Sequence, residues 1–160
     1  MMRLSAAALA LDAPLTGTDT EFFAVTSDTR VLKRGDLFVA LVGPHFDGHA
    51  FLSEAQAKGA AGALVSRARP TSLPTVLVED TRIGLGRLAA HWRAQFSIPL
   101  VAVTGSNGKT TVKNMLAAIL AESGTGLATQ GNLNNDIGVP LPLLRLKRGD
   151  PHAVTEMGMH

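Results

Sequence analysis

The sequence predicts an α/β protein with two units, each built from short β-strands that alternate with helices. Two observations support this fold class: short apolar runs recur along the chain, and segments with a helical spacing of apolar residues lie between them. Such an alternation favours parallel sheets with right-handed crossovers. We expect a small N-terminal α/β domain at residues 1–80, followed by the start of a parallel-sheet domain at 81–160.

The individual elements follow from these patterns and from the turn residues between them. The N-terminal segment predicts an amphipathic helix that ends before Pro14, and Asp12 interrupts its apolar stretch, so a signal peptide is not expected. The other helices are expected at 49–60, 81–96, 111–123 and 137–146. Strands are expected at 22–26, 37–41, 61–66, 75–80, 98–103, 126–129 and 152–158.

Composition limits the classes of partner. Hydrophobic residues make up 46% and charged residues 18%, which is typical of a globular protein. The formal charge is only +2, and no basic run is interleaved with aromatic residues, so we expect no nucleic-acid partner. The absence of cysteine excludes disulfides, thiolate metal sites and a cysteine nucleophile. Apolar runs stay short of the roughly 20 residues that span a bilayer, so we expect a cytoplasmic protein without membrane insertion.

The most informative motif is TGSNGKTT at residues 104–111, which we call the phosphate loop. It joins an expected strand to an expected helix, and a helix N-terminus favours an anion because its first amides are unpaired. Gly105 and Gly108 allow the backbone to fold around a phosphate. Lys109 can reach the β- and γ-phosphates, and the hydroxyl of Thr110 can ligate Mg²⁺. A glycine turn that binds nothing is the alternative, and Gly-Lys-Thr-Thr at such a junction argues against it.

The phosphate loop departs from the full pattern at one position. That pattern has a glycine six residues before the lysine, and Val103 stands there in this sequence. The shortened loop argues against a GTPase switch, as does the absence of an Asn-Lys-x-Asp stretch that reads guanine.

Two further features could complete a phosphate site. Glu156 is expected at the end of an apolar strand, where a carboxylate can complete a Mg²⁺ shell, although an ordinary exposed acid fits the spacing equally well. The stretch GNLNNDIGVP at 131–140 offers several side-chain amides from one loop. Its composition alone favours a turn with a helix cap at Asp136.

The first unit has its own polar candidates. A polar cluster directly follows the first expected strand, where α/β sheets place ligand contacts: Ser27, Asp28, Thr29 and Arg30. His45 and His49 lie four residues apart, but Gly48 intervenes before the helix begins. We therefore expect solvated or hydrogen-bonding histidines rather than a metal-binding pair.

Taken together, these segments resemble the Mur ligase family, which forms amide bonds with ATP during peptidoglycan synthesis. The resemblance rests on SDTR, GDLFVALVG, FDGHAF and AQAKGA in the first unit and on TGSNGKTT in the second, in the family's order. GSNGKTTVKNM and GNLNNDIGVPLPLLRL resemble the branch that joins D-alanyl-D-alanine to UDP-N-acetylmuramoyl tripeptide. The resemblance implies a UDP-substrate domain followed by the start of a P-loop ATPase domain.

The resemblance also implies roles for individual residues, with Lys109 as the catalytic residue and Thr110 and Glu156 as Mg²⁺ ligands. The implied ATP-binding residues are Thr104, Gly105, Ser106, Asn107, Gly108, Lys109, Thr110 and Thr111. The implied substrate-binding residues are Ser27, Thr29, Arg30, Asp47, Asn134 and Asn135. The terminal carboxylate of the tripeptide would attack the γ-phosphate of ATP, and the amine of D-alanyl-D-alanine would attack the resulting acyl phosphate.

Two departures from the family limit this interpretation. Family members usually have Asn-His after EMGM, whereas His160 follows Met159 directly here, and family enzymes are several hundred residues long. We therefore expect an N-terminal part of a ligase, incomplete by itself, from a protein that is monomeric at full length. A non-catalytic nucleotide- or UDP-sugar-binding module stays open as an alternative. A related ligase that adds the third amino acid also stays open, although NLNND argues against it, and the first unit argues against a folate ligase.

Overall fold

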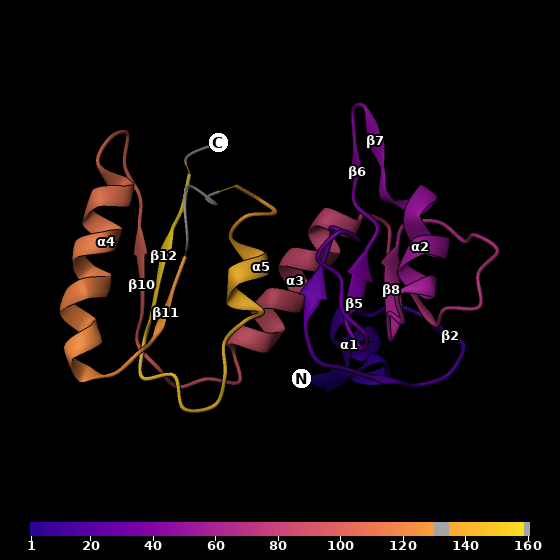
Figure 1. The fold of residues 1–160 in the computed structure, drawn as a ribbon, viewed down its shortest axis with the longest axis horizontal. Helices are drawn as coiled ribbons and strands as arrows, with labels where there is room; N and C mark the ends of the chain where they lie inside the picture. The colour runs from indigo at the N-terminus through magenta and orange to yellow at the C-terminus, as the bar shows by residue number, and fades with distance from the viewer. Residues whose placement is uncertain (130–134, 159–160) are drawn as a thin grey trace. The chain divides into compact units, whose positions relative to one another are not determined.

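The computed structural model describes residues 1–129 and 135–158. It confirms the α/β class and divides the chain into two compact units, Met1–Leu88 and Ala89–His160 (Figure 1). Each unit contains its own sheet with parallel strands. The division falls within helix α3 (Thr81–Arg93), and the functional domains 1–80 and 81–160 stay a prediction.

The first unit is built on a five-stranded sheet in the order β2-β9-β8-β5-β4. These strands are β2 (Leu15–Thr16), β4 (Val25–Thr26), β5 (Leu37–Val39), β8 (Gly62–Val65) and β9 (Thr75–Leu77). Four of them run parallel, and β2 at the edge is antiparallel to β9. Every residue of β5 and β8 is buried, which explains the continuous apolar runs from which they were predicted.

Helices cover both faces of this sheet. On one face, Ala63 belongs to a buried cluster with Leu52 and Ala55 of α2 (Leu52–Ala57). On the other face, a side chain at Gly62 would meet Leu4 of α1 (Leu4–Leu11), because its Cβ would lie 2.8 Å from the Leu4 side chain. The expected N-terminal helix is therefore confirmed, and it ends where Asp12 adopts a left-handed conformation.

Several predicted elements of the first unit have different limits. The strand predicted at 22–26 is divided, because β3 (Glu21–Phe22) pairs with β1 (Met2–Arg3) while β4 pairs with β5. The strands predicted at 37–41 and 75–80 end at β5 and β9, two or three residues early. A hairpin of β6 (Val42–Gly43) and β7 (Phe46–Asp47) follows β5, and the 3₁₀-helix η1 (Gly48–Phe51) replaces the first turn of the helix predicted at 49–60.

The second unit contains a three-stranded parallel sheet in the order β10-β12-β11. The strands are β10 (Leu100–Val103), β11 (Leu127–Ala128) and β12 (Ala153–Glu156), and β12 is buried along its length. Figure 1 shows α4 (Lys109–Leu120) on one side of this sheet and α5 (Pro140–Leu143) on the other. The helix predicted at 111–123 begins two residues earlier and ends as the 3₁₀-helix η2 (Ala121–Ser123). The helix predicted at 137–146 is limited to α5, whose first residue is a proline without a donor N–H.

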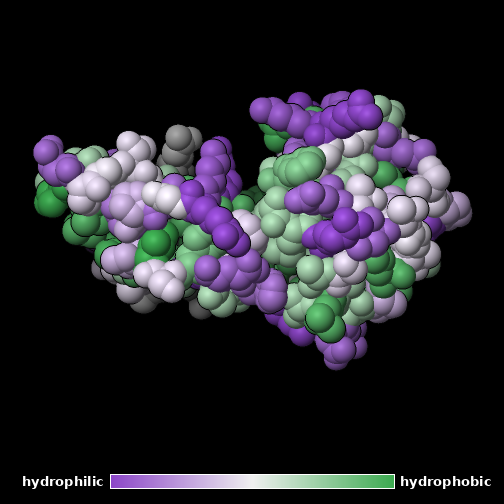
Figure 2. Space-filling model, turned by 90° about the horizontal axis from the view of Figure 1, so that it is seen from below, coloured by the Kyte–Doolittle hydropathy of each residue, from purple (hydrophilic) through white to green (hydrophobic). Residues whose placement is uncertain are grey.

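The surface agrees with a globular composition. Figure 2 shows hydrophilic residues interspersed with hydrophobic ones on one face of the molecule. Of the helices in the described ranges, none has the length and apolar character needed to cross a bilayer.

A buried histidine connects the β6–β7 hairpin to the central sheet of the first unit. The backbone N–H of Ser66 donates to Nε2 of His49 at 3.0 Å, so Nε2 carries no proton. Nδ1 of His49 therefore carries the proton and donates it to Asp47 at 2.7 Å. Asp47 also accepts from the backbone N–H of His49 and pairs with Arg67. The expectation of a hydrogen-bonding histidine is confirmed for His49.

We expect His49→Ala to lower the free energy of unfolding by about 1–3 kcal/mol, because it removes the imidazole that accepts from the Ser66 amide and donates to the Asp47 carboxylate. Urea denaturation of the chain measures this loss. His45→Ala is the matched control, since His45 is exposed in the hairpin turn and its loss should stay within about 0.5 kcal/mol. Equal losses in the two variants would contradict a stabilising role for the His49 contacts.

Candidate active site

The phosphate loop joins the end of β10 to the start of α4. Gly105 and Gly108 have φ values of 143° and 73°, a region that glycine adopts without strain. Gly108 is the N-cap of α4 and has no side chain to accept a hydrogen bond from the first turn. The local sequence therefore produces a helix N-terminus suited to an anion, as predicted from the motif.

Most of the predicted ATP-binding residues are accessible to a ligand. The exposed ones are Thr104, Ser106, Asn107, Gly108, Thr110 and Thr111. Lys109, the first residue of α4, is half-buried, and its Nζ donates to the carbonyl oxygen of Gly105 at 2.7 Å. The ammonium of Lys109 thus lies over the loop that precedes it. This is the position from which it can contact a phosphate held by the loop.

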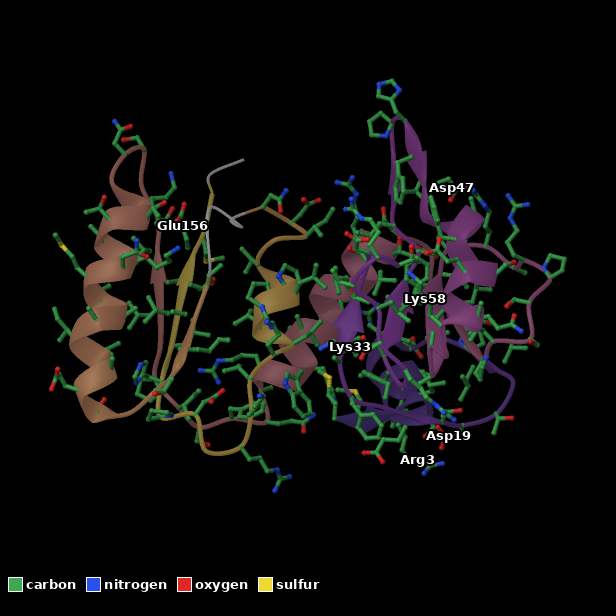
Figure 3. All side chains as sticks on the ribbon, viewed as in Figure 1. Arg3, Asp19, Lys33, Asp47, Lys58 and Glu156 are labelled. Atoms are coloured by element: carbon green, nitrogen blue, oxygen red, sulfur yellow. The ribbon has the colours of Figure 1, made fainter. Side chains whose placement is uncertain are left out.

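Thr110 and Glu156, the two predicted metal ligands, lie in direct contact. The hydroxyl of Thr110 donates to Oε2 of Glu156 at 2.8 Å. Glu156 is 1% exposed and lies at the end of β12 (Figure 3). It is paired in register with Val103, the last residue of β10. Since parallel strands end at one edge of a sheet, this pairing places the carboxylate beside the phosphate loop.

The donor atoms of Thr110 and Glu156 fit Mg²⁺, because hydroxyl and carboxylate oxygens are the hard ligands that it prefers. Within residues 1–129 and 135–158, no group of three or more His, Cys, Asp or Glu side chains could hold a metal ion. A cation at this edge would therefore take its other ligands from water and phosphate oxygens, as Mg²⁺ commonly does in nucleotide sites.

Lys113 is a charged residue of this site that the sequence analysis missed. It lies one helical turn after Lys109, and its Nζ is 3.9 Å from Oε2 of Glu156. Both side chains are 2% exposed. Its spacing from Lys109 could have identified it, because residues four apart on a helix share one face. The face of α4 that carries both lysines turns toward the sheet.

The polar cluster of the first unit lines a pocket of about 410 Å³ at the carboxyl end of β4. Its lining residues are Ser27, Asp28, Thr29, Arg30, Phe38, Phe46, Phe51 and Glu54. Three of the predicted substrate-binding residues are thus brought together, and Asp47 is not among the lining residues. Phe46 and Phe51 stack with their ring centroids 5.6 Å apart. This ring pair could not be predicted from the sequence, because no local spacing marks a contact that a hairpin creates.

Arg30 forms an ion pair with its neighbour Asp28. The guanidinium donates from Nε at 2.9 Å and from Nη2 at 2.7 Å, and these hydrogen bonds lower the pKa of Asp28 to about 2. The Arg30 side chain is 86% exposed, so it is accessible to an anionic ligand. At Asp47, the hydrogen bond from His49 lowers the pKa of the carboxyl group. The same contact stabilises the β6–β7 hairpin.

The asparagine pair of the second unit is only partly described. Asn134 lies outside the described residues. Oδ1 of Asn135 accepts from the backbone N–H of Gly138 at 2.6 Å and from that of Ile137 at 3.3 Å. The side-chain oxygen of Asn135 thus caps the turn before α5.

Comparisons with known proteins agree with the fold and with the motif. The sequence profile of the Mur ligase middle domain matches residues 103–160. The UDP-N-acetylmuramoyl-tripeptide–D-alanyl-D-alanine ligase of Escherichia coli (strain K12) is 53% identical over 148 residues, which cover 92% of this chain and 33% of that protein. The chain thus spans about a third of the length of the curated relatives it matches.

Solved structures are similar over the same extent. A crystal structure of MurF from Acinetobacter baumannii has a TM-score of 0.91 at 36% identity and covers 99% of this chain and 36% of that one. The MurF ligase of Thermotoga maritima in complex with ADP has a TM-score of 0.76 at 36% identity, with 84% of this chain and 32% of that one covered. The chain belongs to the Mur ligase family, as shown by 53% sequence identity over 92% of its length, by the shared fold and by the match to the middle-domain profile.

Proposed function

We propose that the protein carrying this chain is an ATP-dependent ligase that joins D-alanyl-D-alanine to UDP-N-acetylmuramoyl tripeptide. The observation that carries this proposal is the contact of Thr110 with Glu156 at the sheet edge beside Lys109. The names of the similar proteins support the choice of substrates, and the similar ligase in complex with ADP supports the choice of nucleotide. Peptidoglycan synthesis in the cytoplasm, with its consequences for cell shape and division, is the proposed setting, and the full-length protein is proposed to be a monomer.

The proposed reaction brings two anions together. The terminal carboxylate of the tripeptide attacks the γ-phosphate of ATP, which gives an acyl phosphate and ADP. The amine of D-alanyl-D-alanine then attacks the acyl carbon, and inorganic phosphate leaves as the amide forms. The barrier includes repulsion between the carboxylate and the phosphates, which the ammonium of Lys109 reduces. Mg²⁺ held by Thr110 and Glu156 would neutralise phosphate charge when bound.

The pocket of the first unit is the proposed site of the uridine nucleotide. A nucleotide combines a flat aromatic base with a charged diphosphate. The stacked rings of Phe46 and Phe51 offer a surface for a base, and Arg30 offers a cation for a phosphate. Ser27 and Thr29 add polar groups to the same pocket. Asp47 stays a proposed contact of the uridine nucleotide, and Asn134 and Asn135 stay proposed contacts of the muramoyl part of the substrate.

A non-catalytic binding module is the second candidate, because the chain spans only a third of the relatives. A module that only binds a nucleotide does not require a carboxylate and a hydroxyl paired at its phosphate loop. This pair favours the ligase. Release of ADP and phosphate by the intact protein, dependent on both the UDP-tripeptide and the dipeptide, would distinguish the two candidates.

We expect Lys109→Ala to weaken ATP binding about 10- to 100-fold, because it removes a charged contact to the phosphates. Binding of the UDP-tripeptide should stay within about twofold, since its proposed pocket lies in the other unit. Calorimetric titration with each ligand measures both effects. Lys147→Ala is the charge-matched control on an exposed lysine of the same unit. A parallel loss of both affinities would refute the division into two sites.

We expect Arg30→Ala to weaken UDP-tripeptide binding about tenfold and to leave ATP binding unchanged, because Arg30 lines the pocket of the first unit, whereas the phosphate loop belongs to the second. Calorimetry of both ligands provides the test. The control is Arg69→Ala, an exposed arginine that does not line this pocket. An Arg30 variant with unaltered affinity for the UDP-tripeptide would remove this residue from the proposed site.

The ion pair of Arg30 with Asp28 has a pH dependence of its own. The pKa of Asp28 is about 2 in the folded protein, below the ordinary value of about 3.9. A depressed carboxyl pKa stabilises the fold above the ordinary pKa, and this contribution is lost as the pH falls from about 4 toward 2. In Arg30→Ala, carbon-detected NMR titration should give an Asp28 midpoint near the ordinary value. An unchanged midpoint would show that Arg30 is not the cause.

A further inference from the structure

Lys113 is a buried cation for which the proposed reaction provides no role. Its residue exposure is 1%, although a lysine is rarely buried to this extent without a charged partner. Burial removes the ammonium from water, and this cost is recovered only through close interaction with an opposite charge. The placement of Lys113 therefore depends on the carboxylate of Glu156, which is equally buried.

Lys113 and Thr110 contact the same oxygen atom. Thr110 donates to Oε2 of Glu156 at 2.8 Å, and Nζ of Lys113 lies 3.9 Å from that oxygen. The two residues are three apart on α4, so they project from one face of the helix. Glu156 comes from β12, and the contacts thus connect the last residue of a central strand to the first turns of the helix.

The distances assign different tasks to the two contacts. The Thr110 contact has the length of a hydrogen bond, whereas the Lys113 contact is an ion pair that exceeds hydrogen-bond length. An ion pair of this length attracts the carboxylate without taking up a hydrogen-bonding position on its oxygen. The side chains of Lys113 and Glu156 are both almost fully buried, so we expect the ammonium to act on the site through Glu156.

We infer that Lys113 is a positioning residue that holds the Glu156 carboxylate against Thr110 in the orientation needed for a divalent cation. This inference rests on the proposed function, in which Glu156 and Thr110 ligate Mg²⁺. Without Lys113, the buried carboxylate lacks its opposite charge and turns from the helix toward water. Binding of ATP by the loop then persists, while the gain in affinity that Mg²⁺ provides is lost.

The test is calorimetric titration of the full chain with ATP, once in Mg²⁺ and once in EDTA. Lys113→Met keeps an unbranched side chain one atom shorter and removes its charge. We expect its ATP affinity in EDTA to stay within about twofold of the unsubstituted chain, and the gain from Mg²⁺ to fall at least tenfold. A merely structural role would leave this gain unchanged in a folded variant, and that result would overturn the inference.

Two further variants complete the test. If Lys113→Met does not fold, Lys113→Arg replaces it. An arginine keeps the charge beside Glu156, so the folded variant should retain the gain in ATP affinity from Mg²⁺ within about threefold. Loss of this gain in Lys113→Arg would overturn the inference. Lys147→Met is the matched control on an exposed lysine. Glu156→Gln tests the proposed function itself. If this variant retains the gain in ATP affinity from Mg²⁺, the proposed metal site is refuted and the inference fails with it. If Glu156→Gln loses this gain while Lys113→Met keeps it, only the role of Lys113 is rejected.

Discussion

The pairing of β10 with β12 is the constraint on which the second unit depends. The two strands are far apart in sequence, yet they lie parallel and in register, with Val103 opposite Glu156. This register makes the phosphate loop and the carboxylate leave the sheet at the same edge. A shift by one residue would turn Glu156 to the other face of the sheet, away from Thr110. Backbone pairing between β10 and β12 therefore determines where the functional side chains of the site lie.

In the first unit, a hairpin rather than strand register brings the residues of the pocket together. Its pocket depends on a hairpin that brings Phe46 close to Phe51, and this hairpin is fixed by the buried imidazole of His49 between Asp47 and the Ser66 amide. The side chains that define the hairpin are thus not the ones that line the pocket. The family resemblance implies Asp47 as a substrate contact, and in the structure its carboxylate oxygens contact His49 and Arg67.

The elements that the sequence predicted are those that local patterns determine. The strand, glycine turn and helix around Lys109 follow from an apolar run, two glycines and helical spacing, and the structure confirms each within a few residues. The ring pair and Lys113 could not be predicted in this way, since each depends on a contact between distant segments. The division of the strand predicted at 22–26 has the same origin, because an apolar run does not specify which partner each residue takes.

The charges at the sheet edge explain why the site needs a ligand to complete it. Lys113 pairs with the carboxylate of Glu156, whereas Lys109 and the N-terminus of α4 lie at the phosphate loop. This arrangement has an excess of positive potential, which favours an anion at the loop. In the proposed reaction, a nucleoside triphosphate brings more negative charge than the loop and Lys109 neutralise, and a divalent cation would restore the balance. The cation requires a carboxylate nearby, and a carboxylate buried to this degree requires a cation of its own. In the proposed site, Lys113 meets that requirement from the helix that also carries Lys109.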